Sequence, residues 1–198
     1  MQPRPRIHTN TWSEVPSRLI PRLCQAEGCG APMVQGNEFN QFFCTTASHP
    51  KPHEHWVPSK PAVVTVVIDP LGCLCLVRRK IPPGIGELCL PGGHVTIGNT
   101  LEQTAVIELE EEANIRASLF QLHYLGSSFE VNPSVVLVGF AMFARNDQIE
   151  EFVENDETSE RIRTPFADAT RDMVAFVGNW TFIQATRNCI KNGSLVRP

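Results

Sequence analysis

The sequence predicts an α/β protein in which a mixed sheet lies between helices. A continuous, mostly β-branched run over residues 62–68 is typical of a buried central strand. Residues 101–113 carry apolar side chains at helical spacing without proline, and residues 177–192 show a second helical pattern. Further strand-like runs stand before and after the first helix, so we expect one sheet covered by helices on its faces.

The first part of the chain differs from the rest in composition. Residues 1–22 are rich in proline and arginine and lack periodicity, which predicts a flexible N-terminal extension. Residues 23–58 contain two clusters of cysteine and histidine, a pattern typical of a small structural zinc module. The main domain is expected over residues 59–198.

The two clusters in residues 23–58 supply ligands for one tetrahedral zinc ion. The predicted ligands are Cys24, Cys29, Cys44 and His49, and His53 competes with His49 for the fourth position. The spacing within each cluster is wider than the usual C-x2-C, so unrelated buried cysteines and surface histidines are the alternative. A zinc ion here would be structural, because so short a segment cannot bury its own core.

The elements of the main domain follow in order. The strand over 62–68 is expected to turn at residues 69–72 into a second strand over 73–78, which ends at two arginines. Residues 81–87 predict a loop, and Pro91-Gly92-Gly93 a tight turn. Residues 121–128 and 134–144 predict two more strands, and residues 146–160 an acidic, mobile loop.

The first helix carries the chemistry. Thr100 and Gln103 form a capping-box pattern at its start, and Leu101, Ala105, Val106 and Leu109 form its apolar stripe. Glu108, Glu111 and Glu112 stand at i, i+3 and i+4, which places their Cβ atoms about 5–6 Å apart on one face. Three close carboxylates repel one another unless a hard cation such as Mg²⁺ or Mn²⁺ lies between them. The alternative is a solvated acidic face.

The stretch from the glycine turn through this helix resembles the Nudix hydrolase motif, which runs from a Gly through a Glu to Arg-Glu-apolar-x-Glu-Glu-x-Gly. Gly93 takes the place of the first Gly, and the three glutamates fall on Glu108, Glu111 and Glu112. The upstream LVRR and LPGG segments also resemble the family. Three positions depart from it: Asn99 replaces the first Glu, Ile107 the Arg, and Asn114 the last Gly. Asn tolerates a left-handed helix cap, whereas Ile107 cannot orient the glutamates by ion pairing as the Arg does.

The resemblance implies a Nudix αβα sandwich that hydrolyses the pyrophosphate bond of a nucleoside diphosphate linked to another moiety, such as FAD or ADP-ribose. It implies that Glu108, Glu111, Glu112 and the Gly93 carbonyl hold Mg²⁺ or Mn²⁺. It further implies that Arg79 contacts substrate phosphate, and that an acidic residue such as Glu157 or Glu160 lies near the metals. The general base stays open between Glu111 and a loop acid such as Glu160.

The resemblance also covers the Cys/His module and the oligomeric state, and it leaves an alternative to the hydrolase function. The zinc-ribbon-containing type, similar to plant plastid FAD and ADP-sugar pyrophosphatases, matches the Cys/His module, and homodimers are common in the family. Asn99 and Ile107 support the alternative of a catalytically weakened nucleotide-binding module with the same fold.

Composition excludes several classes. The net charge of −4 argues against a nucleic-acid-binding surface. No apolar run approaches the ~20 residues that span a bilayer, and the first residues lack the apolar core of a secretory signal. Seven cysteines without such a signal indicate reduced thiols or metal ligands instead of a disulfide framework, and we expect a cytoplasmic protein. The start is Arg-bearing and free of acidic residues until Glu14, which leaves organelle targeting open.

Overall fold

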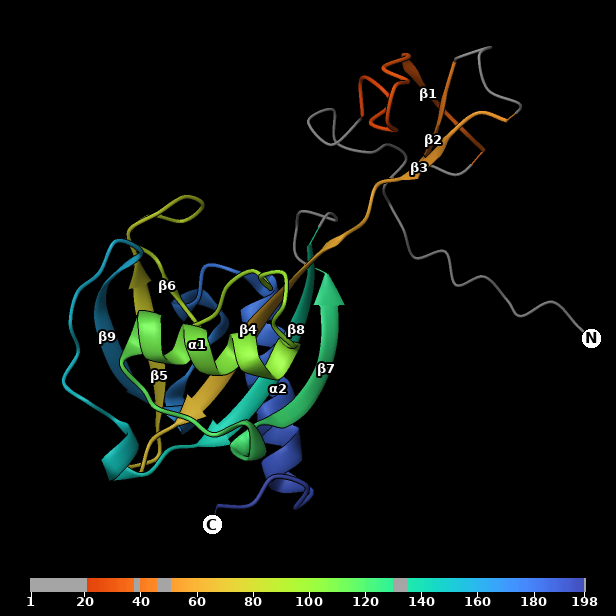
Figure 1. The fold of residues 1–198 in the computed structure, drawn as a ribbon. Coiled ribbons are helices and arrows are strands. Elements are labelled where there is room, and N and C mark those ends of the chain that lie inside the picture. The colour runs from red at the N-terminus through yellow and green to blue at the C-terminus, as the bar shows by residue number, and fades with distance from the viewer. Residues whose placement is uncertain (1–20, 38–39, 46–50, 130–134, 198) are drawn as a thin grey trace, which may run out of the picture. The chain divides into compact units, whose positions relative to one another are not determined.

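The computed structural model describes residues 21–37, 40–45, 51–129 and 135–197. The chain divides into two compact units, Met1–Ser59 and Lys60–Pro198, and each is described by itself (Figure 1). The predicted extension over residues 1–22 lies almost wholly outside the described residues. Within the described residues, none of the helices has the length and apolar character required to cross a membrane.

The N-terminal unit contains a small antiparallel sheet. Its strands are β1 (Met33–Gln35), β2 (Gln41–Cys44) and β3 (Glu54–Trp56), in the order β1-β2-β3. The buried apolar side chains among its described residues are Cys24, Phe42 and Cys44. This core is very small, which makes another source of stability necessary.

The second unit contains one mixed sheet, as the sequence predicted. Its strands are β4 (Lys60–Ile68), β5 (Cys73–Arg79), β6 (Leu88–Cys89), β7 (His123–Phe129), β8 (Val135–Phe143) and β9 (Thr158–Pro165). The order is β6-β5-β4-β8-β7, with β9 paired to β5. Strands β4 and β8 run parallel from Lys60↔Val135 to Ile68↔Phe143, and the other pairs are antiparallel. The β-branched run therefore forms the central strand.

Two helices cover the two faces of this sheet (Figure 1). Helix α1 (Leu101–Ala113) packs on one face, where its Leu109 lies in a cluster with Val67 and Val77. Helix α2 (Val177–Lys191) packs on the other, where Phe182 joins a cluster with Val64. Alternation along the strands thus assigns successive side chains to opposite helices. Short 3-10 turns connect the elements at Leu119–Gln121, Asn146–Gln148, Phe166–Asp168 and Arg171–Met173.

Strand β9 corrects the sequence prediction. Residues 146–160 were expected to be one acidic loop, but the last of them already belong to β9, which pairs with the full length of β5. Its residues, TSERIRTP, are mostly polar and show no apolar alternation. The strand forms because β5 offers a free edge, and that information lies far away in the sequence.

Gly139 shows how tightly α2 packs on the sheet. A Cβ atom at this position of β8 would lie 2.1 Å from Cδ1 of Phe182. Phe182 itself is 2% exposed and cannot move toward solvent without leaving the core. The absence of a side chain at Gly139 therefore sets the distance between helix and sheet.

We predict that Gly139→Ala destabilises the protein by about 1–3 kcal/mol, because the added methyl group overpacks the core against Phe182. Urea unfolding followed by circular dichroism measures the loss. The double variant Gly139→Ala, Phe182→Leu should lose less than the sum of the two single changes. Additive losses would show that the two residues do not constrain each other.

Candidate functional site

The turn Pro91-Gly92-Gly93 lies against the backbone of the central strand β4. The N–H of Val63 donates to the Gly93 carbonyl at 2.9 Å, and the N–H of Thr65 donates to the Pro91 carbonyl at 3.0 Å. A Cβ atom on Gly92 would lie 2.0 Å from the carbonyl oxygen of Val63. Only glycine fits at this position, so the turn motif is a packing requirement of the sheet.

Helix α1 begins and ends as the sequence predicted. The Thr100 hydroxyl accepts the N–H of Gln103 at 3.2 Å, and the Gln103 side chain accepts the N–H of Thr100 at 2.8 Å. Asn114 caps the other end in the left-handed conformation, with φ of 50°. Its side-chain oxygen also accepts the N–H of Val153 at 2.8 Å, so Asn supplies a contact that Gly could not make.

The three glutamates of α1 differ in exposure. Glu112 is 4% exposed, and its Oε2 accepts the N–H of Gly92 at 2.8 Å. Glu108 is half-buried, and its carboxylate lies so close to Gly93 that a Cβ there would be 2.3 Å from Oε1. Glu111 is exposed. Two carboxylates therefore point to the glycine turn, and the third lies beside them in solvent.

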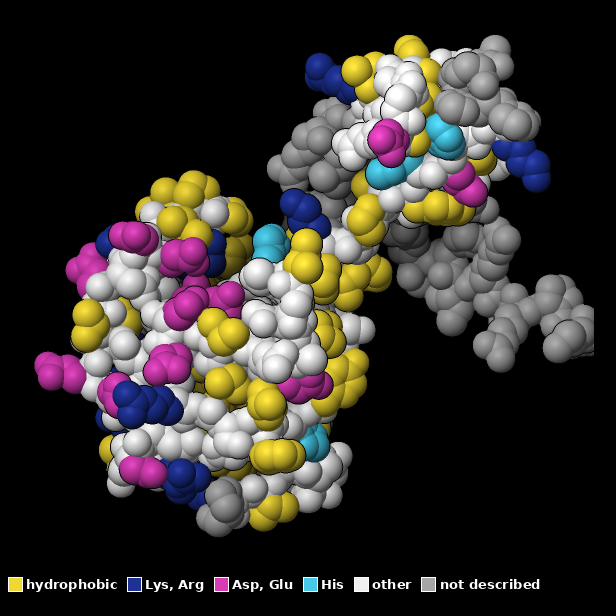
Figure 2. Space-filling view, viewed as in Figure 1, with side chains coloured by type: hydrophobic (Ala, Val, Ile, Leu, Met, Phe, Trp, Pro, Cys, Tyr) yellow, Lys and Arg dark blue, Asp and Glu magenta, His cyan; other side chains and the backbone are white. Residues whose placement is uncertain are grey.

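Burial and mutual repulsion disfavour the ionised forms of Glu108 and Glu112, so their pKa values are raised. Desolvation, followed by the charges of Glu111 and Glu157, raises the pKa of Glu108 to about 7. Desolvation, together with the charges of Glu108 and Glu157, raises the pKa of Glu112 to about 7, against the opposing effects of the Gly92 N–H and of Arg79. Such a concentration of negative charge in a partly dry site favours binding of a cation. Figure 2 shows acidic side chains gathered over and beside α1.

The segment that leads into β9 is hydrogen-bonded to the C-terminal end of α1. The sequence did not reveal this contact. Asn155 donates from Nδ2 to the Glu111 carbonyl at 2.6 Å, and the Thr158 hydroxyl donates to the Glu112 carbonyl at 3.0 Å. These bonds satisfy carbonyls that the helix leaves free at its end. The Asn155 side chain also accepts the N–H of Glu157 at 2.8 Å. Asn155 thus holds Glu157 near the glutamates of the helix.

Arg79 and Glu160 lie on opposite faces of the sheet. Along β5, Val77 packs in the α1 cluster and Leu76 in the α2 cluster, so Arg79 lies on the α1 face and Arg78 on the other. Glu160 pairs with Arg78 in the β5–β9 register and forms an ion pair with it. The structure therefore brings Arg79 and Glu157 to the glutamates but does not bring Glu160 there.

Arg79 is held firmly in its place. Its Nε–H donates to the Pro83 carbonyl at 2.7 Å, and its guanidinium lies over the ring of Phe176 at 5.2 Å from the centroid. Its charge lowers the pKa of Glu112. Ile107, at the position where the motif has Arg, is 39% exposed. Arg79 therefore supplies positive charge near Glu112 from the sheet instead of from the helix.

Comparison with known proteins identifies the family of this domain. The family model described as the NUDIX domain matches residues 58–184. The chain belongs to the Nudix family. A curated relative from Nostoc sp., described as an uncharacterized Nudix hydrolase, is 39% identical over 67 residues. That match covers 32% of this chain and 40% of the relative, so the chain spans less than half of the relative's length.

Solved Nudix structures share the fold. The NUDIX hydrolase from Nitrosomonas europaea has a TM-score of 0.61 at 19% identity and covers 86% of this chain and 91% of its own. The C. elegans Ap4A hydrolase has a TM-score of 0.54 at 20% identity, over 66% of this chain and 98% of its own. The NUDIX domain of Shewanella oneidensis NrtR, complexed with ADP ribose, has a TM-score of 0.55 at 20% identity, over 67% of this chain and 88% of its own.

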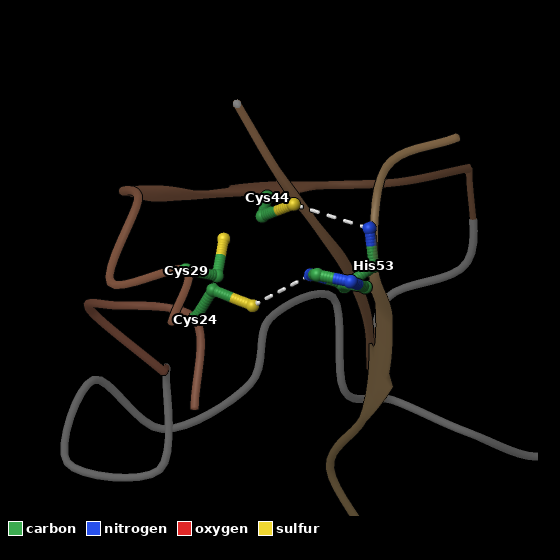
Figure 3. Close-up of side chains that lie close together, drawn as sticks. All are labelled: Cys24, Cys29, Cys44 and His53. Atoms are coloured by element: carbon green, nitrogen blue, oxygen red, sulfur yellow. Dashed lines mark hydrogen bonds between the residues drawn. The ribbon is translucent and has the colours of Figure 1, made fainter. Parts of the chain in front are cut away.

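The N-terminal unit, nearly all of which precedes the residues matched by the NUDIX model, contains a cluster of potential zinc ligands. The ligand atoms of Cys24, Cys29, Cys44 and His53 all lie within 4.8 Å of one another (Figure 3). Cys24 Sγ lies 3.3 Å from His53 Nδ1, and the His53 N–H donates to Cys44 Sγ at 3.1 Å. Ligands around a tetrahedral zinc ion with Zn–S bonds of about 2.3 Å lie about 3.8 Å apart, so this donor set fits zinc after a small contraction.

His53, the alternative fourth ligand in the sequence analysis, therefore joins the three cysteines. His49 lies outside the described residues. The four ligands come from two places: Cys24 and Cys29 flank a turn, while Cys44 ends β2 and His53 directly precedes β3. A metal ion here would connect the turn to the sheet.

We predict that, without added Mg²⁺ or Mn²⁺, the Nudix domain loses stability as the pH rises from about 5 to about 8. The folded-state pKa of about 7 for Glu108 and Glu112 exceeds the ordinary value of 4.5. The folded state therefore binds more protons than the unfolded state between these values. This stabilising contribution is complete below about 4.5 and is lost as the pH rises through about 7.

Melting temperatures at several pH values measure this effect. Glu112→Gln should reduce the fall in melting temperature, because the amide does not ionise. Glu102→Gln, a change of an exposed carboxylate on the same helix, should leave the fall unchanged. Equal pH profiles for the natural protein and Glu112→Gln would contradict the assigned cause.

We predict that His53→Ala removes zinc from the protein, whereas His49→Ala and His55→Ala retain it. Elemental analysis of the purified chain, with about one zinc ion per natural chain, makes the comparison. His55 is the matched control, because it is a β3 residue two positions from His53 and is absent from the cluster. Loss of zinc in His49→Ala with retention in His53→Ala would reverse the assignment of the fourth ligand.

Proposed function

We propose that this chain is a Nudix pyrophosphohydrolase that depends on Mg²⁺ or Mn²⁺ and acts on a nucleoside diphosphate linked to another moiety. The observation that carries the proposal is the pair of partly desolvated carboxylates, Glu108 and Glu112, directed at the Gly92–Gly93 turn. Both have pKa values raised to about 7, so a divalent cation would relieve their repulsion in the ionised form.

The metal would be held by Glu108, Glu111, Glu112 and the Gly93 carbonyl. That carbonyl accepts one hydrogen bond from Val63, which leaves its second lone pair for a cation. When bound, Mg²⁺ or Mn²⁺ neutralises diphosphate charge and lowers the pKa of a coordinated water. Arg79, on the same face of the sheet, contributes further positive charge for the substrate phosphates.

In the proposed reaction, a water oxygen attacks one phosphorus of the diphosphate. The bond between that phosphorus and the bridging oxygen breaks, and the products are two phosphate monoesters. The proton of the water passes to a carboxylate. We assign this role to Glu111, because it is exposed beside the other two and makes no side-chain hydrogen bond to the turn. Glu160, the other candidate base, lies on the opposite face of the sheet.

FAD and ADP-ribose are the proposed substrates to test first. Proteins with a similar fold include an Ap4A hydrolase and a domain complexed with ADP ribose. Ap4A and ADP ribose both contain adenosine linked through phosphates, as FAD does. The proposal also includes a structural zinc ion at Cys24, Cys29, Cys44 and His53, a homodimer, and a cytoplasmic location. None of the seven cysteines, all of which lie in the described part of the chain, forms a disulfide, which fits a reducing compartment.

The second candidate function is nucleotide binding with weak turnover. The specific observation behind it is Ile107, whose exposed side chain provides no guanidinium to orient the glutamates of α1. A misplacement of about 1 Å in a catalytic group can cost about 100-fold in rate. Arg79 acts on Glu112 from the sheet, which favours the enzyme over the binding module.

We predict that the natural protein releases phosphate monoesters from FAD or ADP-ribose only with Mg²⁺ or Mn²⁺, and that Glu112→Gln lowers kcat by at least about 100-fold. The amide can still accept the Gly92 N–H, so the fold should be retained. Glu110→Gln is the matched control, because Glu110 is exposed and pairs with Arg116 instead of facing the turn.

Product analysis by chromatography separates the two candidate functions. Metal-dependent cleavage that survives in Glu110→Gln and disappears in Glu112→Gln supports the enzyme. Nucleotide binding without cleavage in the natural protein would overturn the proposed hydrolase and leave the binding module.

A further inference from the structure

Strand β7 forms an edge of the main sheet that has no covering strand. It stands at the end of the strand order and pairs with β8 alone among the described strands (Figure 1). No backbone hydrogen bond from another described segment reaches its outer side. Such an edge presents N–H and C=O groups that can pair with a further strand.

The composition of β7 provides little protection against pairing. Its residues, HYLGSSF, include no Lys, Arg, Asp, Glu or Pro, the residues that usually guard an exposed edge. Strand β9 at the other end of the sheet is guarded, since it carries Glu160, Arg161, Arg163 and Pro165. The two edges of one sheet thus differ in the feature that controls strand addition.

Two exposed aromatic residues lie on β7. Tyr124 is 59% exposed and Phe129 is 66% exposed. Tyr124 stands opposite Phe140 and Phe129 opposite Val136 in the β8 register, so both lie on the face that α1 partly covers. Leu125 is the extra residue of a bulge between Tyr124 and Gly126, which is why residues five apart share a face. Figure 2 shows apolar surface along this side of the unit.

We propose that β7 is a dimer interface, at which it pairs antiparallel with β7 of a second copy of this chain. This proposal assigns a specific surface to the homodimer and does not depend on the proposed hydrolase activity. A strand with no charges does not repel its own copy, and an isologous contact requires a self-complementary surface.

The bulge makes β7 complementary to itself. With a two-fold axis at Ser127, Ser127 stands opposite the partner's Ser127, and Ser128 opposite the partner's Gly126. Because Leu125 is the extra residue in each copy, Phe129 then stands opposite the partner's Tyr124. All paired residues lie on matching faces, and two aromatic cross-strand pairs form, a favourable kind of contact in antiparallel sheets. A register without the bulge would place these aromatic residues on opposite faces.

Sedimentation equilibrium of the full chain at micromolar concentration tests the proposal, with a dimer expected for the natural protein. Ser127→Lys places two ammonium groups directly opposite each other at the axis, so we expect the dissociation constant of the dimer to rise at least about tenfold. Leu71→Lys is the matched control, because Leu71 is 78% exposed on the turn between β4 and β5. Both variants should keep the melting temperature of the monomer, since both positions are exposed.

A second variant tests the register. Directly opposed residues in an antiparallel pair have Cβ atoms about 4.5–5.5 Å apart, close to the separation that a disulfide spans. Ser127→Cys should therefore give a covalent dimer under mild oxidation, whereas Leu71→Cys and the natural protein should not. A monomeric natural protein, or a dimer that survives Ser127→Lys without cross-linking through Ser127→Cys, would overturn the proposal. The hydrolysis assay would be unaffected by either result.

Discussion

The close contact between the glycine turn and the central strand is the constraint on which the site depends. Gly92 packs directly on the backbone of Val63, and Gly93 lies beneath the carboxylate of Glu108. Two missing side chains allow helix α1 to approach the sheet closely enough to bury Glu112. Because burial disfavours the ionised form, the same contact that completes the fold also creates sites with high affinity for protons or cations. The close contact at Gly92 and Gly93 therefore explains both the packing of α1 on the sheet and the raised pKa values of Glu108 and Glu112.

The C-terminal end of helix α1, which carries Glu112, is stabilised by polar contacts with a distant part of the chain. Asn155 and Thr158 bind the last helical carbonyls, and Asn114 caps the helix while accepting an N–H from the same loop. These bonds occupy groups that would otherwise be unsatisfied in a half-buried place. They also bring Glu157 to the carboxylates of α1. The departure from the family motif at Asn114 thus has a structural compensation.

The N-terminal unit, in its described residues, lacks an apolar core large enough to stabilise it, unlike the sheet of the second unit. Its three strands are short, and Cys24, Phe42 and Cys44 are its buried apolar residues among those described. Hydrophobic burial of this size contributes little compared with the conformational entropy of the segment. Two of these three buried residues are also potential metal ligands, so the core and the proposed zinc site are largely the same atoms. A metal ion would supply folding energy that the apolar contacts cannot.

The sequence alone determined the central strand β4, its hairpin with β5, the two helices and the Thr100 cap of α1. It also determined the glycine turn and the set of glutamates. Each of these signals lies within a few neighbouring residues. The tertiary structure decided which residues meet across long separations. It placed Arg79 and Glu157 with the glutamates and Glu160 on the other face, and it brought His53 to the cysteines. In a strand, a shift of one residue reverses the face, and strand pairing sets this register. A polar strand such as β9 carries no local signal, so only its partner reveals it.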